Sequence, residues 1–468
     1  MLKRSYYYAI LLLPSVFFSL SVHGQQKVLG LKEAESLAIV NYPSIKSKIN
    51  QLNASKANLN EGKSENLPDL NFSAQQVYGT VNGQFGPSYG FKGFNVSSAG
   101  PNLASQNWNA GFGSLYLSNI SWDFFSFGKA KEKVKIQNIS VSRDENDLAQ
   151  EQFQHQIRVA SSYLNLLAAQ ELTKAQKDNL NRAIELQKVV AARVRNGLNA
   201  GVDSSQANAE IASAKIALTN AQETEQEQSN LLAQYIGIQV PTYFVLDSSF
   251  IFKTPNTVDA QKDSSLNHHP LLQYYQSRIA ISKEQSNYLG TFKYPTFSVF
   301  GVFQGKGSGF GNNYGINQND FTGSYLNGAN PSRYNYLFGL GIIWNLTSPV
   351  RVHYQLQSQK FITEQYKNDF DLIDNQLKAQ LKLSETRLSN ALKNFHSAPE
   401  EVKAAKDAYT QKLVLYKNGL SNIVDFTQAL YALNRAEVDN YIAANNVWQA
   451  LLYKAAASGD FSLFINNF

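Results

Sequence analysis

The sequence predicts a mixed α+β membrane protein, built from a duplicated repeat that supplies four short strands and long coiled-coil helices. The duplication is clearest in Arg195–Ala207 and Lys417–Ala429, which read RNGLNAGVDSSQA and KNGLSNIVDFTQA, 222 positions apart. Two 68-residue helical patterns, 129–196 and 351–418, end at these stretches. Short segments alternate apolar and polar residues with the period of a strand. Such a repeat indicates that the chain contains two copies of one structural unit and that its function uses both.

The first 24 residues are expected to be a secretory signal peptide. Lys3 and Arg4 precede an apolar run, and small residues follow it. A retained anchor helix is the alternative. Without these two cations the formal charge falls from +6 to +4, a surplus too small to indicate a nucleic-acid partner. The chain has no cysteine, which excludes disulfides, thiol chemistry and a lipidated N-terminal Cys.

The first repeat is expected over 25–237. A short helix, 31–41, precedes a second helix that Pro68 stops. Strands are expected at about 68–79 and 112–125, joined by a Gly-, Asn- and Ser-rich segment that indicates an exposed loop. Residues 238–267 are expected to carry the chain between repeats at mid-length.

The second repeat, 268–468, follows the same order. Its strands are expected at about 295–304 and 334–346, with a Gly-rich loop between them. The run Gly305–Gly311 lacks the Walker spacing and precedes no helix, so no nucleotide site is expected. The last strand alternates over eleven residues, close to the roughly 9–11 of a tilted membrane strand. Trp122 and Trp344 are expected to end their strands at a membrane interface. An ordinary sandwich strand is the alternative.

Each long helix is expected to be roughly 100 Å long, at about 1.5 Å per residue. Pro399 is expected to kink or restart the second one. Asn-Gly then ends each helix, so hairpin tips are expected near 197–203 and 419–425. Asp203 and Asp425 stand where the returning helices are expected to begin. In each repeat the two shorter helices together have about the length of the long one, so they are expected to run end to end beside it.

The sequence contains no motif typical of an enzyme active site. Outside the expected signal peptide the chain has five histidines, no cysteine and no His-Glu-x-x-His motif. His268 and His269 precede Pro270 at a helix start, which favours helix capping over metal ligation. We therefore expect no enzyme activity, no cofactor and no metal site.

Four strands cannot close a barrel, because about eight is the practical minimum, so several copies must share one axis. Together with Leu67-Pro68, the Trp122…Ser126 element and the duplicated Gly-Leu…Asp tips, the sequence resembles the TolC-like outer-membrane efflux and secretion channel family, also called outer membrane factors. The resemblance implies a homotrimer: a β-barrel in outer-membrane lipid above a periplasmic α-barrel. It implies docking to a periplasmic adaptor (membrane fusion) protein and an inner-membrane transporter.

The expected function is therefore the outer-membrane channel of a tripartite efflux pump, a passive conduit for small molecules. The exit duct of a type I protein secretion system is the alternative. A periplasmic coiled-coil adaptor or a structural stalk explains the helices but not the duplicated aromatic strands.

The resemblance also assigns roles at the tips. The adaptor-contact positions are Asn196, Gly197, Leu198, Asn418, Gly419 and Leu420. Asp425 matches the first of two acidic positions that ring the periplasmic entrance in the family, and the second holds Gln428. Tyr416 and Asp203 match a pair that latches the closed state, whereas Ser421 and Val202 stand where a companion Arg–Thr latch would be. The alternative is that both Asp residues only cap helices.

Overall fold

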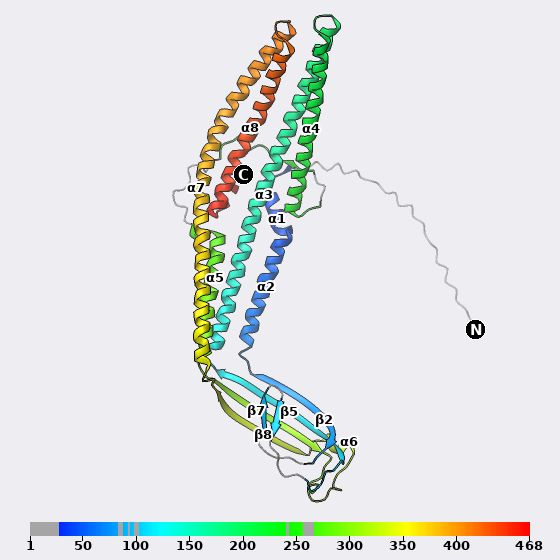
Figure 1. Ribbon diagram of the computed structural model, residues 1–468, viewed down its shortest axis with the longest axis vertical. Coiled ribbons are helices and arrows are strands. Elements are labelled where there is room, and N and C mark those ends of the chain that lie inside the picture. Colours follow the sequence, from blue (N-terminus) through cyan, green and yellow to red (C-terminus); the bar gives the residue numbers. More distant parts are fainter. Residues whose placement is uncertain (1–27, 83–87, 92–93, 98–102, 240–242, 256–265) are drawn as a thin grey trace, which may run out of the picture.

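In the computed structural model the chain is an elongated molecule, with a bundle of long helices at one end and a twisted sheet at the other (Figure 1). The structure describes residues 28–82, 88–91, 94–97, 103–239, 243–255 and 266–468. The expected signal peptide, 1–24, lies outside these residues, as do parts of the first Gly-rich loop and of the connection between repeats.

Each repeat places two shorter helices beside one long helix. In the first repeat α2 (Pro43–Ser64) and α4 (Gly201–Ile236) both pack along α3 (Lys129–Arg195). In the second repeat α5 (Pro270–Thr291) and α8 (Ile423–Ser458) pack along α7 (Ser348–Lys417). The end-to-end arrangement expected from the helix lengths is therefore present in both copies.

A glycine closes each end-to-end join. Gly237 follows α4 with φ 76°, and a Cβ there would lie 2.8 Å from Asn41 Cβ at the end of α1 (Leu31–Asn41). Gly459 follows α8 with φ 76°, and its Cβ would lie 2.8 Å from His269 Cα at the start of α5. Both positions require glycine for the left-handed backbone and for the close approach. His269 caps α5, accepting a hydrogen bond from Leu271 N at 3.2 Å.

The expected restart at Pro399 is wrong, because α7 continues through this proline as one helix. A proline inside a helix removes one hydrogen bond and costs about 3 kcal/mol. The 70-residue helix packs along α5 and α8, and this packing holds the chain helical across the proline.

The sheet has four antiparallel strands in the order β2 (Asp69–Thr80), β5 (Ala110–Phe125), β7 (Thr296–Ser308) and β8 (Arg333–Ile343). It is open, with β2 and β8 at its edges. One cross-strand row joins Leu70, Ile120, Gly301 and Phe338, and the next row on the same face joins Phe72, Ser118, Phe303 and Tyr336. Phe72 is 73% exposed and Phe338 is 72% exposed. This apolar face has no partner within the described chain.

Neither tryptophan ends its strand, although β5 does end at Phe125, the bound expected for it. β5 continues past Trp122 to Phe125, with a register shift between them, and β8 stops at Ile343, one residue before Trp344. Each indole N–H instead donates to a carbonyl before the first strand of its own repeat: Trp122 to Asn66 at 2.9 Å and Trp344 to Lys293 at 3.2 Å. Each tryptophan therefore lies beside the segment that joins helix to strand in its own repeat. The two tryptophans occupy equivalent positions in the two repeats.

The loops beyond the sheet hold more structure than their composition indicates. The first contains a small hairpin, β3 (Ser88–Phe91) and β4 (Phe94–Ser97), and the second ends in α6 (Tyr325–Ala329). In the second loop Phe310, Tyr314 and Phe321 pack on one another, with Phe310 and Tyr314 ring centroids 4.8 Å apart. Aromatic packing of this kind orders a segment that its glycines alone would leave loose.

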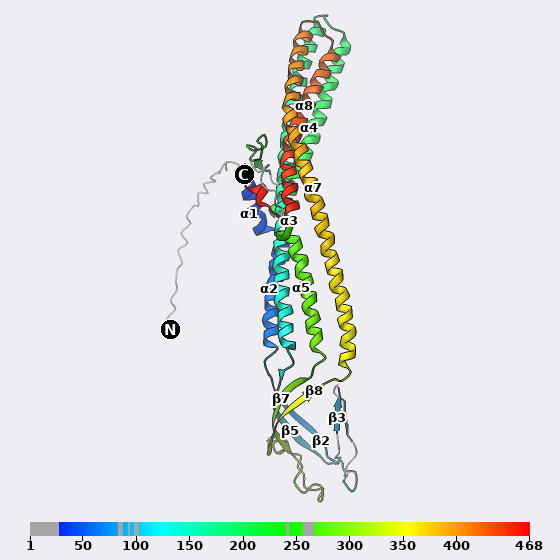
Figure 2. The same cartoon turned by 90° about the vertical axis from the view of Figure 1, so that its left-hand side faces the viewer.

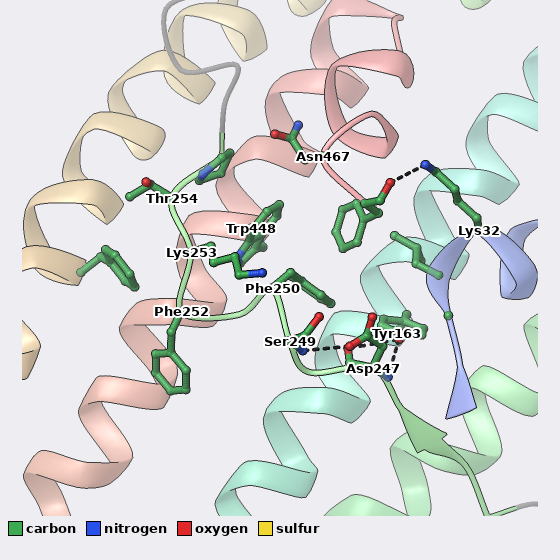
Figure 3. Close-up of a pocket in the computed structure, with 15 residues that line it drawn as sticks. Lys32, Tyr163, Asp247, Ser249, Phe250, Phe252, Lys253, Thr254, Trp448 and Asn467 are labelled. Atoms are coloured by element: carbon green, nitrogen blue, oxygen red, sulfur yellow. Dashed lines mark hydrogen bonds between the residues drawn. The ribbon is translucent and has the colours of Figure 1, made fainter. Parts of the chain in front are cut away.

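The largest core cluster lies at mid-length, where α1, the chain end and the connection between repeats form a layer on one side of the helices (Figure 2). A short parallel pair, β1 (Val28–Leu29) and β6 (Val245–Leu246), and a final turn of helix, α9 (Ser462–Ile465), belong to it, and a 3-10 turn, Leu266–His268, precedes α5. Trp448 is 2% exposed and meets Phe250 edge-on, with ring centroids 5.0 Å apart. Beside them lies a cavity of about 720 Å³, and Tyr163 and Asp247 are among the residues that line it (Figure 3).

Candidate functional site at the helical tips

The two helical hairpins end together, at the end of the molecule farthest from the sheet (Figure 1). Their tips have the same backbone. Gly197 and Gly419 have φ of 71° and 78°, which is left-handed. Leu198 N donates to Arg193 O, and Leu420 N donates to Leu415 O, both at 2.9 Å. In this helix ending the amide after the glycine bonds back to a carbonyl of the last helical turn.

The six expected adaptor-contact residues are all on the surface. Leu198 is 65% exposed and Leu420 is 74% exposed, although both are apolar. The asparagines and glycines beside them are exposed as well. Two exposed leucines at equivalent places of a duplicated motif form a small apolar surface at the extreme end of the molecule.

Asp203 and Tyr416 lie close together, but through a third residue that the sequence did not indicate. Asn199 Nδ2 donates to Asp203 Oδ2 at 2.5 Å and to Tyr416 Oη at 3.3 Å. Tyr416 is 1% exposed, and burial raises the pKa of its hydroxyl, with the Asp203 carboxylate adding to the effect. The hydroxyl therefore remains protonated. The expected pair is present as a bridge, Asp203–Asn199–Tyr416, that joins the two hairpins.

Arg193 completes this bridge, and the sequence analysis did not identify it. Its Nε donates to Asn199 Oδ1 at 2.7 Å, its Nη1 donates to Lys417 O at 2.9 Å, and its guanidinium lies 5.6 Å from the centre of the Tyr416 ring. A basic residue in the last turn of a helix ordinarily complements the helix dipole, so its position alone indicates no further role. The sequence does contain one indication of this role: the equivalent position in the second repeat is Leu415 and not a basic residue. A residue that differs between two otherwise similar copies suggests a function specific to one copy.

The alternative that Asp425 and Asp203 cap their helices is wrong, because the caps lie at Asn422 and Ala200. α8 begins at Ile423, and its cap is Asn422, whose Oδ1 accepts from Asp425 N at 2.8 Å. α4 begins at Gly201, and its cap position is Ala200, which makes no side-chain capping hydrogen bond. Both helices begin two residues before their aspartates, because Ala200 and Asn422 already have the extended backbone of a cap.

The Asp425 carboxylate instead has a cationic neighbour on its own hairpin. Its Oδ2 lies 3.3 Å from Lys412 Nζ and 3.4 Å from Ser421 Oγ. Both side chains of the ion pair are partly exposed, at 44% and 40%. Gln428 is exposed one turn further along α8. The positive charge of Lys412 partly cancels the negative potential of the Asp425 carboxylate. No feature of the sequence indicated this pair.

Below the tips the hairpins are joined by apolar packing and by two further polar links. Leu186 and Val190 of the first hairpin share one buried apolar cluster with Phe426 of the second. Arg182 donates to both carboxylate oxygens of Glu437, at 3.1 and 2.8 Å. The Tyr431 hydroxyl donates to Glu210. Separating the hairpins requires breaking links at several heights.

A buried carboxyl group lies outside this site. Glu35 on α1 is 5% exposed, and neither of its oxygens has a hydrogen-bond partner among the described residues. Burial raises its pKa to about 9. Its spacing with Leu31, Ala34 and Ala38 places it on the buried face of α1, a signal that the sequence analysis did not use.

Comparison with known proteins agrees with this architecture. Residues 35–238 match the family of outer membrane efflux proteins. This match covers less than half of the chain. No curated protein sequence matches it. Similar solved structures include VceC from Vibrio cholerae (TM-score 0.71, 16% identity, covering 92% of this chain and 96% of that one) and the Campylobacter jejuni outer membrane channel CmeC (0.73, 14%, 92% and 85%). The open state of Neisseria gonorrhoeae MtrE is also similar (0.69, 15%, 92% and 89%).

At these identities the likeness to the solved structures shows the fold. The family is one of transport conduits and not of enzymes. None of the described helices has the length and apolar character that crossing a bilayer requires. Among the described residues no group of three or more His, Asp or Glu is placed to hold a metal ion.

Proposed function

We propose that this protein is the outer-membrane exit duct of a tripartite efflux pump and works as a homotrimer. One observation carries the proposal: an open four-stranded sheet with an exposed aromatic face continues directly into helices of 67 and 70 residues. The free edges of β2 and β8 are unpaired backbone that a second copy can extend. Three copies supply twelve strands, enough to close a barrel that four cannot close.

In this assembly the aromatic face meets lipid, and Trp122 and Trp344 lie at the membrane interface. Their bonds to the carbonyls of Asn66 and Lys293 hold the indoles where strand passes into helix. Tryptophan prefers this boundary, because its ring is apolar and its N–H is polar. The sheet is thereby positioned along the membrane normal.

The helical tips then form the periplasmic entrance and its gate. Leu198, Leu420 and the Asn-Gly pairs before them are the surface offered to an adaptor protein. The bridge through Asn199 and Arg193 holds the two hairpins of each copy together in the closed state. Asp425 contributes a ring of three carboxylates, weakened by Lys412, that attracts cations.

The proposal is tested with the purified, detergent-extracted protein. A trimer by native mass spectrometry and discrete conductance steps in planar bilayers are the expected results. A water-soluble monomer without conductance would contradict the proposal.

A further inference from the structure

A groove lies outside the sheet, between the ends of α2 and α3 that meet it. It has a volume of about 520 Å³ and is lined by lysines at its rim and by apolar side chains at its floor. The rim holds Lys63, Lys131 and Lys135, and the floor holds Leu59, Val134 and Ile139. No carboxylate lines it. It borders Asn66, the residue whose carbonyl accepts from the Trp122 indole, so it begins where the aromatic face of the sheet ends.

The groove opens on the same side of α3 as the mid-length layer. Tyr163, which donates to Leu29 O in that layer at 2.9 Å, lies 29 residues after Val134 of the groove. At 3.6 residues per turn this is about eight turns, so along α3 both residues have the same facing. In Figure 2 the layer stands on one side of the helices. Around a channel axis this bulky layer can only face outward, and the groove faces outward with it.

The charge of the groove is not neutralised by the protein. Lys63 and Lys131 are exposed and make no ion pair within the described chain. Lys135 is paired with Glu132 at 2.8 Å and with Glu284 of α5 at 3.5 Å, and Lys133 pairs with Glu65. The nearest carboxylates are thus occupied, while two rim lysines remain available above an apolar floor.

We propose that this groove binds an anionic phospholipid of the periplasmic leaflet, with its phosphate between Lys63 and Lys131 and an acyl chain along Leu59, Val134 and Ile139. The inference rests on the proposed membrane position of the sheet. Basic grooves beside membrane-spanning segments attract anionic headgroups. The apolar floor separates this site from one for free phosphate, because only an amphiphile uses both parts. Bound lipid would fasten the α2–α3 pair to the membrane surface.

The test is native mass spectrometry of the intact detergent-extracted protein, titrated with phosphatidylglycerol or with phosphatidylcholine of the same acyl chains. Phosphatidylglycerol should bind more tightly. Each lysine near an anionic lipid surface contributes about fivefold in affinity, so the double variant Lys63→Gln/Lys131→Gln should weaken phosphatidylglycerol binding by roughly 25-fold. The control Lys403→Gln/Lys406→Gln removes two exposed lysines of α7, far from the sheet, and should change nothing.

Two further measurements distinguish lipid binding from binding of phosphate alone. Val134→Asn should weaken binding of both lipids, and excess inorganic phosphate should not displace phosphatidylglycerol. Equal binding of the two lipids, an equal loss in the control, or displacement by phosphate would overturn the assignment. Conductance is recorded on the same samples. Its absence would contradict the proposed channel, whereas normal conductance with no lipid preference would contradict the lipid site alone.

Discussion

The side chain of Arg193 donates to the backbone carbonyl of Lys417 across 2.9 Å, joining the end of α3 to the end of α7. These residues are 224 positions apart, and they belong to different repeats. The same guanidinium orients Asn199, which in turn holds Asp203 and Tyr416. One side chain of the first hairpin therefore fixes the second.

Replacing Arg193 should loosen the closed tips. Arg193→Gln removes two charge-assisted hydrogen bonds, each worth about 1.5 kcal/mol or more, so the open population should rise at least tenfold. Single-channel recording should show this as a higher resting conductance. Arg195→Gln is the matched control, because Arg195 Nε donates only within its own helix, to Ala191 O at 3.2 Å. Equal behaviour of the two variants would remove Arg193 from the gate.

The Tyr416 hydroxyl should contribute separately. Tyr416→Phe keeps the stacking on Phe426 but removes the acceptor of the Asn199 bond, at a cost of about 1 kcal/mol. Resting conductance should rise, though less than in Arg193→Gln. Tyr409→Phe serves as the control, because Tyr409 packs on the same ring and its hydroxyl makes no hydrogen bond within the described chain. An unchanged conductance in Tyr416→Phe would show that the hydroxyl does not hold the tips closed.

Cation selectivity should depend on the balance of Asp425 and Lys412. Asp425→Asn should lower the preference for cations and the block by divalent cations. Lys412→Gln should raise both, because it frees a carboxylate that the lysine now opposes. Reversal potentials in a salt gradient measure the change. Asp371→Asn, an exposed carboxylate far down α7, should leave the reversal potential unchanged. Opposite shifts in the first two variants are required, and parallel shifts would argue against a carboxylate ring.

Stability should fall as pH rises, because of Glu35. Its pKa is about 9 in the folded chain and 4.5 when solvated, so between these values the unfolded chain loses a proton that the folded chain retains. The stabilisation is complete below pH 4.5 and is lost as the pH rises toward 9. Thermal unfolding of the extracted protein should therefore show a lower midpoint at pH 8.5 than at pH 5.

Glu35→Gln should flatten this dependence and raise the midpoint at pH 8.5, since a neutral amide needs no proton to be buried. Glu61→Gln, an exposed carboxyl on α2, is the control and should behave as the wild type does. A wild-type midpoint independent of pH would mean that Glu35 is solvated in the working protein.

Local periodicity determined the repeat, the long helices, the alternating strands and the Asn-Gly tips. These features depend on residues within a few turns of one another, such as the alternation from Tyr336 to Ile342 and the left-handed glycines 197 and 419. The residues at which helices and strands begin and end did not follow from this periodicity. Whether Asp425 or Asn422 caps α8 depends on the backbone of two or three residues, which the spacing alone leaves open.

Only the tertiary structure decided which side chains meet. Arg193 reaches Lys417, Lys412 reaches Asp425, and Glu35 is buried without a partner. Each outcome depends on how helices distant in the sequence pack and on distances of a few ångströms. The sequence placed two hairpins at one end because it repeats their motif, but the motif is nearly the same in both copies. The sequence places Arg193 in the first copy alone, where the second has Leu415, but only packing decided that this arginine reaches Lys417.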